Sequence, residues 1–230
     1  MMRTGLQRAF SKASKEDFEK ALQVRYTSCM SSKRIGIFGG TFDPPHLGHL
    51  LLASEAGEQL GLGRLLWVLT PLPPHKLDQP ITPLEHRLAM LQLAIADDLA
   101  CELSRLEMER PGPHYTLDTV RIIGEQNPGA ELVLLIGGDS LRDLPAWHRP
   151  AELVSACDQI GVMRRPGDSI DLTALEVALP GIAARVRFVE APLLEISSSK
   201  IRRRVAKGRA YRYYVPAAVY DYIKEHNLYR

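Results

Sequence analysis

Residues 39–49, with the sequence GGTFDPPHLGH, are the part of this chain that most limits how it can fold. Apolar residues precede the stretch and an apolar-periodic segment follows it, which predicts a turn from a buried strand into a helix. Two glycines let the backbone approach a ligand closely, and Pro45 suits the first helical turn. Because the first N–H groups of a helix favour an anion, such a turn is typical of a phosphate site. His46 and His49, three residues apart, would lie on one face beside that phosphate.

The rest of the chain alternates short apolar runs with segments of helical period. For the helix that follows the second strand, Thr82 and Glu85 have the spacing of a capping box. The alternation predicts an α/β fold, namely a doubly wound parallel sheet covered by helices on both faces. We expect strands at residues 34–38, 65–69, 101–106, 132–136, 159–163 and 186–189, and helices at 47–60, 82–96, 115–126, 199–207 and 216–225.

The 230 residues are best interpreted as one domain that follows an extension. Residues 33–230 carry the alternating pattern without a repeat or a linker, so we expect a single domain there. Residues 1–32 are mostly polar apart from a short amphipathic stretch, and we expect them to be a mobile N-terminal extension. A start at Met30 would leave the domain complete, which indicates that residues 1–29 have no catalytic role.

Four segments rich in Gly, Pro, His or Ser follow expected strands directly. They are residues 39–49, 70–76, 137–139 and 196–202. In a doubly wound sheet, ligands bind outside the carboxyl ends of the strands, at the switch point of the strand order. Because all four segments are expected to leave the sheet at that edge as loops, the sequence predicts that they contribute to one site.

Several common kinds of site are excluded. The sequence has no G-x-G-x-x-G, no G-x-x-x-x-G-K-[ST] and no G-x-S-x-G segment, so it supports neither dinucleotide-type binding nor a P-loop nor a serine elbow. Cys29, Cys101 and Cys157 are scattered, which argues against a disulfide framework and a zinc ribbon and fits a cytoplasmic protein. A net charge of +2, and apolar runs far shorter than the ~18–20 residues of a membrane span, argue against nucleic-acid and membrane partners. Phosphate chemistry through positioning and electrostatics remains.

A second strand-to-helix corner is expected at residues 196–202, with the sequence ISSSKIR. Its serine hydroxyls and the N–H groups of the helix start can bind a phosphate, and Arg202 can close on it. The alternative is a plain serine cap with a solvated basic face, and we favour that interpretation for Arg203 and Arg204. Together with the histidine corner, the segment predicts the second half of a phosphate clamp.

Two further segments could contact a second substrate. Trp147 and His148 follow residues 137–139 in a polar, Pro-flanked loop. The Trp could stack on a flat ring there, or it could anchor the loop on the core. His75 and Lys76 lie in the Pro-rich segment 70–76, where they could reach an anion or remain solvated.

The two corners resemble the signatures of the nucleotidylyltransferase superfamily. Residues 39–49 resemble its (G/T)-x-x-x-P-x-x-x-G-H motif, and residues 196–202 resemble its I-S-[ST]-[ST]-x-I-R motif. The resemblance covers residues 33–230 and implies a Rossmann-like nucleotidylyltransferase fold. Within the superfamily the chain is most similar to the bacterial nicotinate-nucleotide adenylyltransferases, through PPHK at 73–76, YTLDT at 115–119, IGGDS at 136–140, WH at 147–148, RRPG at 164–167 and YVP at 214–216.

The resemblance implies that ATP and nicotinate mononucleotide react to give deamido-NAD and pyrophosphate, a step of NAD biosynthesis. The mononucleotide phosphate would attack the α-phosphorus of ATP in line, without a covalent enzyme intermediate. Mg²⁺ would be the cofactor, bound mainly through the ATP phosphates, and we expect no protein ligand for a metal. His46, His49 and Arg202 would be the catalytic residues.

The resemblance also divides the candidate residues between the two substrates, with Trp147 stacking on the nicotinate ring. The residues expected to bind ATP are Gly39, Gly40, Phe42, His46, His49, Gly137, Asp139, Ile196, Ser197, Ser199 and Arg202. The residues expected to bind the mononucleotide are Thr41, Asp43, His75, Lys76, Tyr115, Thr116, Trp147 and His148.

Departures from the family pattern leave alternatives open. Residues 70–72 are Thr-Pro-Leu where some relatives carry an Asn, and His148 stands where a Tyr often follows the Trp. The acceptor could instead be nicotinamide mononucleotide or phosphopantetheine, although Trp147 and Tyr115 favour a pyridine ring. A non-catalytic nucleotide-binding protein on the same fold is the other alternative, and the presence of both histidines and Arg202 argues against it. The sequence leaves a homo-oligomer open.

Overall fold

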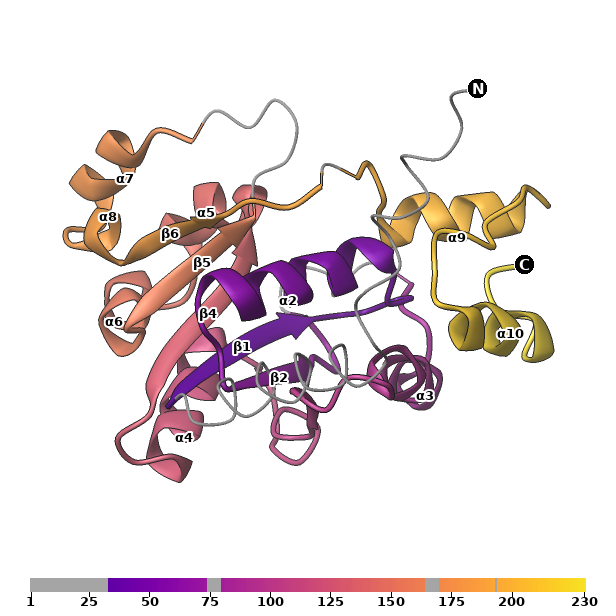
Figure 1. Ribbon diagram of the computed structural model, residues 1–230, viewed down its shortest axis with the longest axis horizontal. Helices are drawn as coiled ribbons and strands as arrows, with labels where there is room; N and C mark the ends of the chain where they lie inside the picture. The colour runs from indigo at the N-terminus through magenta and orange to yellow at the C-terminus, as the bar shows by residue number, and fades with distance from the viewer. Residues whose placement is uncertain (1–32, 74–79, 164–169, 193) are drawn as a thin grey trace, which may run out of the picture.

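The computed structural model of the chain describes residues 33–73, 80–163, 170–192 and 194–230 (Figure 1). The expectations for the extension at 1–32, for His75 and Lys76, and for the motif at 164–167 lie outside the described residues. None of the described helices is long and apolar enough to cross a membrane.

Six parallel strands form one sheet in the described part of the chain. Their order is β3-β2-β1-β4-β5-β6, so the strands are added outward in two directions from β1. The predicted doubly wound parallel sheet is confirmed, and its switch point lies between β1 and β4. The strands are β1 (Arg34–Gly40), β2 (Arg64–Leu69), β3 (Cys101–Ser104), β4 (Glu131–Gly137), β5 (Gln159–Met163) and β6 (Val186–Val189).

Helices connect these strands, and the longer ones were expected from their apolar period. In the segment 138–185, four helices of four to seven residues were not expected, because such segments are too short to show a period. The expectation of a loop at 137–139 is wrong on that account, since β4 runs directly into a helix at Gly138. The helices are α2 (Leu47–Gln59), α3 (Leu84–Ile95), α4 (Thr116–Gln126), α5 (Gly138–Asp143), the 3₁₀ helix η2 (Leu144–Ala146), α6 (Pro150–Ala156), α7 (Leu172–Ala178), α8 (Ile182–Arg185), α9 (Ser198–Ala206) and α10 (Ala217–Glu225).

α2 begins at Leu47 as expected, but two details of the expected helix starts are wrong. His46 has extended backbone angles (φ −147°, ψ 168°) and is the N-cap of α2, so Pro45 precedes the helix rather than occupying its first turn. α3 begins at Leu84, two residues after Thr82, and no side-chain bond caps it. Thr82 lies before the helix, where its backbone N–H donates to the side chain of Asp43 and its carbonyl accepts from Arg87 of α3.

The two faces of the sheet bury separate cores, because successive side chains of a strand point to opposite faces. In β1, Ile35 and Ile37 belong to a cluster that includes α4 and α6, whereas Phe38 belongs to a cluster that includes α2 and α3. Figure 1 shows α2 lying alongside β1. Burial of a side chain such as that of Ile37, which is 1% exposed, contributes about 1.5–3 kcal/mol.

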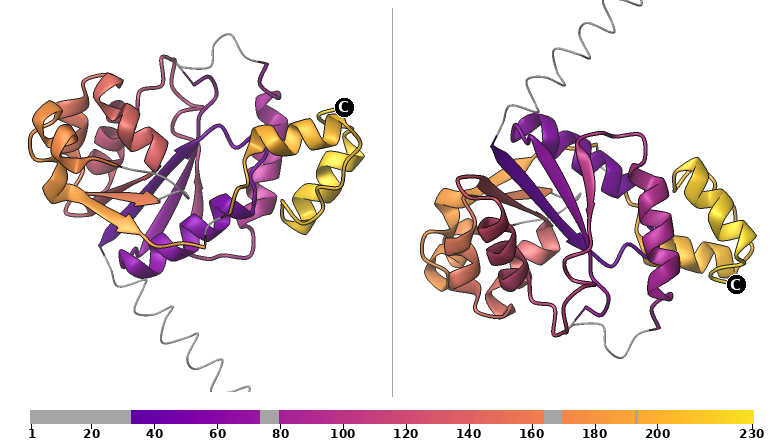
Figure 2. Two further views of the ribbon diagram at one scale, coloured as in Figure 1. Left: turned by 90° about the horizontal axis from the view of Figure 1, so that it is seen from above. Right: turned by 90° about the horizontal axis from the view of Figure 1, so that it is seen from below.

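The C-terminal helices α9 and α10 lie at one end of the molecule, where they pack beside α3 (Figure 2). A third cluster of buried side chains joins the three helices. It contains Met90 from α3, Ile201 from α9, and Val215, Val219 and Ile223 from the segment around α10. This packing brings the last residues of the chain close to the β1–α2 turn.

The sheet separates between β1 and β4 at its carboxyl end. β1 pairs with β4 only from Arg34 to Ile37, although β1 continues to Gly40 beside β2. β4 likewise continues to Gly137 beside β5. The segments that follow β1 and β4 therefore meet where the two strands diverge, which is the place where α/β sheets of this kind bind ligands.

Candidate active site

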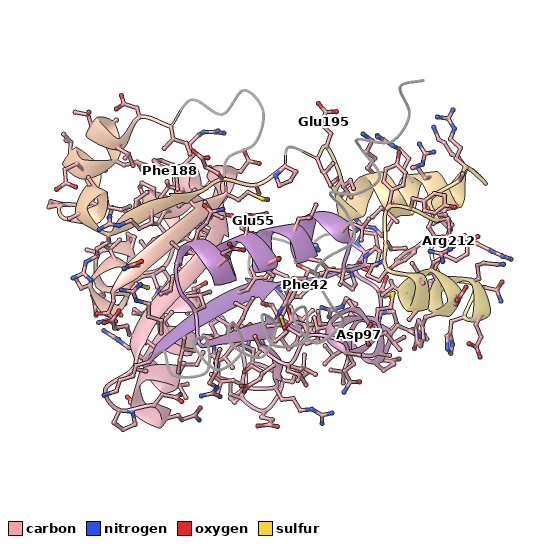
Figure 3. All side chains as sticks on the ribbon, in the orientation of Figure 1. Phe42, Glu55, Asp97, Phe188, Glu195 and Arg212 are labelled. Carbon is pink, nitrogen blue, oxygen red and sulfur yellow. The ribbon has the colours of Figure 1, made fainter. Side chains whose placement is uncertain are left out.

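The turn between β1 and α2, residues 41–46, is built over a buried aromatic ring near the carboxyl end of β1 (Figure 3). Phe42 is 3% exposed and packs edge-on against Phe38, with ring centroids 5.4 Å apart. Its φ of +46° turns the chain sharply. A Cβ on Gly40 would lie 2.8 Å from the Phe42 ring, so only glycine fits there, whereas a Cβ on Gly39 would meet nothing within 4 Å. Gly40 thus supports the turn, and the exposed backbone of Gly39 leaves room for a ligand.

His46 and His49 lie together at the start of α2. Their rings stack with centroids 3.6 Å apart and planes 17° apart, so the expectation that both lie on one face of the first turn is confirmed. The backbone N–H of His46 donates to Nδ1 of His49 over 3.2 Å. Neutral His49 therefore carries its proton on Nε2, from which it can donate to a ligand. Gly48 makes room for the pair, since a Cβ there would lie 3.1 Å from Nδ1 of His46.

The backbone N–H groups at the start of α2 are less available than the sequence suggested. The N–H of Leu47 donates to the carbonyl of Tyr214 over 3.0 Å. The N–H of His49 donates to the carbonyl of His46 over 2.9 Å. The capacity of this corner to bind an anion therefore depends on the imidazoles more than on the helix start.

The second corner, at the start of α9, contacts the first directly. Ser197 is the N-cap of α9, and its hydroxyl accepts a hydrogen bond from a backbone N–H one turn later. The hydroxyl of Ser198 donates to the carbonyl of Pro44 over 2.9 Å, although the two residues are 154 positions apart. A Cβ on Gly48 would lie 3.9 Å from the Cβ of Ile196. The tertiary structure thus places the two predicted halves of the clamp side by side.

Arg202 extends from α9 to the β1–α2 turn. Its Nη1 donates to the backbone carbonyl of Asp43 over 2.8 Å and lies 3.9 Å from Oδ2 of the same residue. The Arg202 side chain is 31% exposed, and Ser199, on the same helix, is exposed as well. Arg203 is also exposed, and Arg204 donates to the carbonyl of Ala210, which agrees with the expectation that these two arginines serve the surface.

Gly137 and Asp139 follow β4, the strand next to β1. Gly137 ends β4 and is the N-cap of α5, and Asp139 lies in the first turn of that helix. Nη1 of Arg142 lies 3.4 Å from Oδ1 of Asp139, and both side chains are about half exposed, at 55% and 50%. The two residues are therefore accessible at the edge where β1 and β4 diverge.

The residues expected to contact the pyridine ring come from two separate segments that the fold brings together. Tyr115, the N-cap of α4, stacks on His148, with centroids 3.9 Å apart and planes 15° apart. Thr116 is the first residue of α4, and it is half-buried. Trp147 is half-buried against the main core cluster, which agrees with the alternative that it anchors the loop.

Asp43 and Thr41, two residues expected to bind the mononucleotide, are engaged within the protein. Asp43 is 4% exposed, and its carboxylate accepts hydrogen bonds from the hydroxyl of Tyr229 at 2.8 Å and from the N–H of Thr82 at 3.2 Å. The carbonyl of Thr41 accepts a hydrogen bond from Arg87 at 3.1 Å. These contacts indicate that both residues shape the turn.

The sequence reasoning missed Arg87, which is 2% exposed. Its guanidinium donates to four carbonyls, those of Thr41, Thr70, Pro71 and Thr82, over 2.7–3.1 Å. Burial lowers the pKa of Arg87, and the nearby Asp43 carboxylate opposes that shift. The sequence could have indicated that Arg87 is buried, because Arg87 occupies a position of the helical period of α3 that is otherwise apolar.

Arg110 was missed as well. It donates to the carbonyl of Tyr115 over 3.3 Å and to Oγ1 of Thr119 over 3.0 Å. Thr119 donates in turn to the buried carboxylate of Glu107 over 2.6 Å. This buried polar cluster supports the start of α4, where Tyr115 stacks on His148.

Comparisons with known proteins agree with this geometry. Residues 37–204 match a protein family described as cytidylyltransferase-like. The probable nicotinate-nucleotide adenylyltransferase of Thermomicrobium roseum is 48% identical over 197 residues, which are 86% of this chain and 92% of the relative. The protein of the same name from Thermus thermophilus is 45% identical over 197 residues, 86% of this chain and all of the relative. A solved structure of Plasmodium falciparum nicotinic acid mononucleotide adenylyltransferase complexed with NaAD superposes with a TM-score of 0.71 at 22% identity, covering 85% of this chain and 97% of that one.

These findings establish different things. The solved structure, at 22% identity, supports the Rossmann-like nucleotidylyltransferase fold. The curated relatives share close to half of their residues with this chain over nearly their whole length. The chain therefore belongs to the cytidylyltransferase-like family and, within it, to the nicotinate-nucleotide adenylyltransferases.

Proposed function

We propose that this chain transfers the adenylyl group of ATP to nicotinate mononucleotide, giving deamido-NAD and pyrophosphate in NAD biosynthesis. The observation that carries the proposal is the junction of two helix starts at the switch point. There the turn that leads to the stacked pair His46 and His49 is hydrogen-bonded to the corner that holds Ser197 and Arg202. Imidazoles, a serine hydroxyl and a guanidinium are donors suited to the several anionic oxygens of a triphosphate.

In this reaction an oxygen of the mononucleotide phosphate attacks the α-phosphorus of ATP. The bond from the α-phosphorus to the oxygen that bridges to the β-phosphate breaks, and pyrophosphate leaves. Negative charge grows on the transferred and leaving phosphates, so the protein contributes mainly by placing positive and hydrogen-bonding groups around them. His46 and His49 would stabilise the α- and β-phosphates, and Arg202 would hold the leaving pyrophosphate.

We place the remaining parts of ATP along the diverging strands. Gly39 and Gly40 would border the phosphates, with Phe42 supporting the turn beneath them. Gly137 and Asp139, at the end of β4, would contact the nucleotide ribose. Ile196, Ser197 and Ser199 would complete the wall formed by α9.

The acceptor would lie on the side of Tyr115 and His148. The outer faces of their stacked rings offer flat surfaces suited to a pyridine ring, and Trp147 precedes His148 in the chain. Thr116, at the start of α4, would place backbone N–H groups near the nicotinate carboxylate. Nicotinamide mononucleotide is the alternative acceptor, because a stacking surface by itself does not distinguish an acid from an amide.

Mg²⁺ would arrive as part of the substrate, the Mg²⁺–ATP complex. The donors at the two corners suit such a complex, since they can neutralise phosphate oxygens while the ion stays on phosphates and water. The Asp43 carboxylate does not suit a metal, because both its oxygens accept hydrogen bonds inside the protein. The proposal needs no nucleic acid, no membrane and no second copy of the chain.

We also propose that the protein acts in the cytoplasm. Cys101 and Cys157 are free thiols, as a reducing compartment would keep them. Burial raises the pKa of both thiols to about 12, so neither is a nucleophile at neutral pH, which fits direct transfer.

The function is tested by incubating the protein with ATP, Mg²⁺ and either mononucleotide, and then separating the products. We expect deamido-NAD and pyrophosphate in equal amounts, a slower reaction with the amide, and no product after Mg²⁺ is removed with EDTA. If neither dinucleotide forms, the functional proposal is wrong. If NAD forms faster than deamido-NAD, the proposed acceptor is wrong, but the assignment of the site residues stands.

A shortened chain tests the proposal that residues 33–230 form the complete catalytic domain. Removal of residues 1–29 is expected to leave kcat and both KM values within about twofold of the full chain, because these residues are mostly polar and precede the alternating strand–helix pattern that begins at residue 33. Steady-state kinetics of both chains would measure this. A loss of more than about tenfold in kcat/KM, with unchanged thermal unfolding, would assign the extension a part in the reaction.

A further inference from the structure

Asp43 is the point at which the C-terminal end of the chain meets the β1–α2 turn. Its buried carboxylate accepts a hydrogen bond from the hydroxyl of Tyr229 at 2.8 Å and another from the N–H of Thr82 at 3.2 Å. Its backbone carbonyl accepts a hydrogen bond from Arg202 at 2.8 Å. One residue thus joins the turn to α9, to the start of α3 and to the end of the chain.

Tyr229 reaches Asp43 because the chain turns back after α10. Asn227 and Tyr229 have φ values of 51° and 64°, in the left-handed region that bulky side chains rarely adopt. The tyrosine hydroxyl lies 3.9 Å from the sulfur of Met90, against α3. Burial raises the pKa of Tyr229, so its hydroxyl stays protonated and donates to Asp43 at neutral pH.

Arg87 also contacts the β1–α2 turn, through the carbonyl of Thr41. Thr82 links the two groups, because its N–H donates to Asp43 while its carbonyl accepts from Arg87 at 2.8 Å. Arg87 also donates to the carbonyls of Thr41 and Thr70 at 3.1 and 2.8 Å. A continuous series of hydrogen bonds therefore runs from the C-terminal end of the chain, through Asp43, to the segment after β2.

We infer that Tyr229 and Arg87 are positioning residues for adenylyl transfer, which act through Asp43 to hold the turn before His46 and to set the place of Arg202. The inference rests on the proposed function. Its physical reason is that a buried carboxylate must keep its donors. Nη1 of Arg202 lies 3.9 Å from Oδ2 of Asp43, so an Asp43 carboxylate that lost the Tyr229 hydroxyl would draw the Arg202 guanidinium toward itself and away from the ATP phosphates.

Tyr229→Phe tests this, since it removes only the hydroxyl. We expect kcat/KM for ATP to fall about tenfold, and the Kd of Mg²⁺–ATP in calorimetric titration to rise, while KM for the mononucleotide changes less. Tyr213→Phe is the matched control, because that side chain is 84% exposed, and it is expected to behave as the wild type. Arg87→Lys keeps the charge but cannot donate to four carbonyls, and it is expected to lower kcat/KM by about tenfold as well.

A general loss of stability would not reproduce this pattern. Val219→Ala removes buried volume from the cluster beside α10 without touching Asp43, and at temperatures where it is folded it should retain the wild-type kcat/KM. Tyr229→Phe in an Arg202→Ala background should lower kcat/KM by a smaller factor than it does in the wild type, because part of its effect acts through the residue that the second change removes.

The outcomes separate the two proposals. If the wild type makes dinucleotide and Tyr229→Phe matches it in kcat/KM and in Kd for Mg²⁺–ATP, the positioning role is wrong and the function stands. If the effects of Tyr229→Phe and Arg202→Ala on kcat/KM were fully additive, the positioning role would also be wrong. If the wild type makes no dinucleotide, the functional proposal fails, and the calorimetric Kd for Mg²⁺–ATP still decides whether Tyr229 positions Arg202.

Discussion

Replacing His46 with alanine is expected to lower kcat by about 10²–10³-fold, equivalent to about 2.7–4 kcal/mol of transition-state stabilisation. His46 is 6% exposed at the start of α2 and stacks on His49, so the two rings form one surface for the phosphates. The substitution removes a hydrogen-bond donor from the place where negative charge grows on the phosphates. It also removes the ring on which His49 stacks. The change is measured as the rate of pyrophosphate release at saturating substrates.

His46→Asn separates this catalytic loss from a loss of stability. His46 is the N-cap of α2, and alanine at a cap position costs about 1 kcal/mol of stability, whereas Asn is among the preferred caps. We therefore expect His46→Asn to unfold near the wild-type temperature and yet to be about as inactive as His46→Ala. His226→Ala, at an exposed histidine that follows α10, is the control for the loss of an imidazole. Near-normal pyrophosphate release from either His46 variant would show that the assigned role is wrong.

Replacing Arg202 with alanine is expected to lower kcat/KM for ATP by about 10²–10³-fold. The guanidinium is held by the backbone carbonyl of Asp43 and remains 31% exposed beside the serine corner, where the leaving pyrophosphate is proposed to lie. Arg202→Lys should recover only a small part of the loss, because an ammonium group cannot make the two parallel hydrogen bonds that a guanidinium can. The mononucleotide KM should change less than that of ATP.

Arg203→Ala provides the matched control on the same helix. Arg203 is exposed and makes none of the contacts described between α9 and the β1–α2 turn. Its replacement by alanine is therefore expected to change kcat/KM by less than about twofold. If the Arg202 and Arg203 variants lost activity equally, a general basic surface rather than a specific contact would explain the effect. A second measurement at higher ionic strength would then show both losses shrinking, because exposed charges are screened by salt.

Local sequence patterns were sufficient to predict most of the secondary structure. The apolar run that ends at Phe38 and the glycines after it predicted a strand and a turn, and β1 continues only two residues further, to Gly40. The helices α4 and α10 begin and end within about one residue of expectation, which is within the usual uncertainty of helix ends. These elements were predictable because each depends on side chains three or four positions apart, or on alternation along a single strand.

Expectations failed where a distant residue changed the local preference. Thr82 and Glu85 have a capping-box spacing, but α3 begins at Leu84, and the backbone N–H of Thr82 donates to Asp43, 39 positions away, while its carbonyl accepts from Arg87. Local capping contributes about 1 kcal/mol, and two buried hydrogen bonds to charged groups outweigh it.

The sequence by itself determined the parallel α/β fold, the two strand-to-helix corners and the pairing of His46 with His49, because each follows from neighbours along the chain. Only the tertiary structure decided how the corners meet and what holds them. Asp43 and Tyr229 are 186 positions apart, and nothing local to either predicts that a terminal tyrosine would bond to the turn before the histidines. Arg87 likewise acts through carbonyls of three separate segments. The contact between Asp43 and Tyr229 depends on the packing of α9 and α10 beside α3, which brings together residues that no sequence period relates.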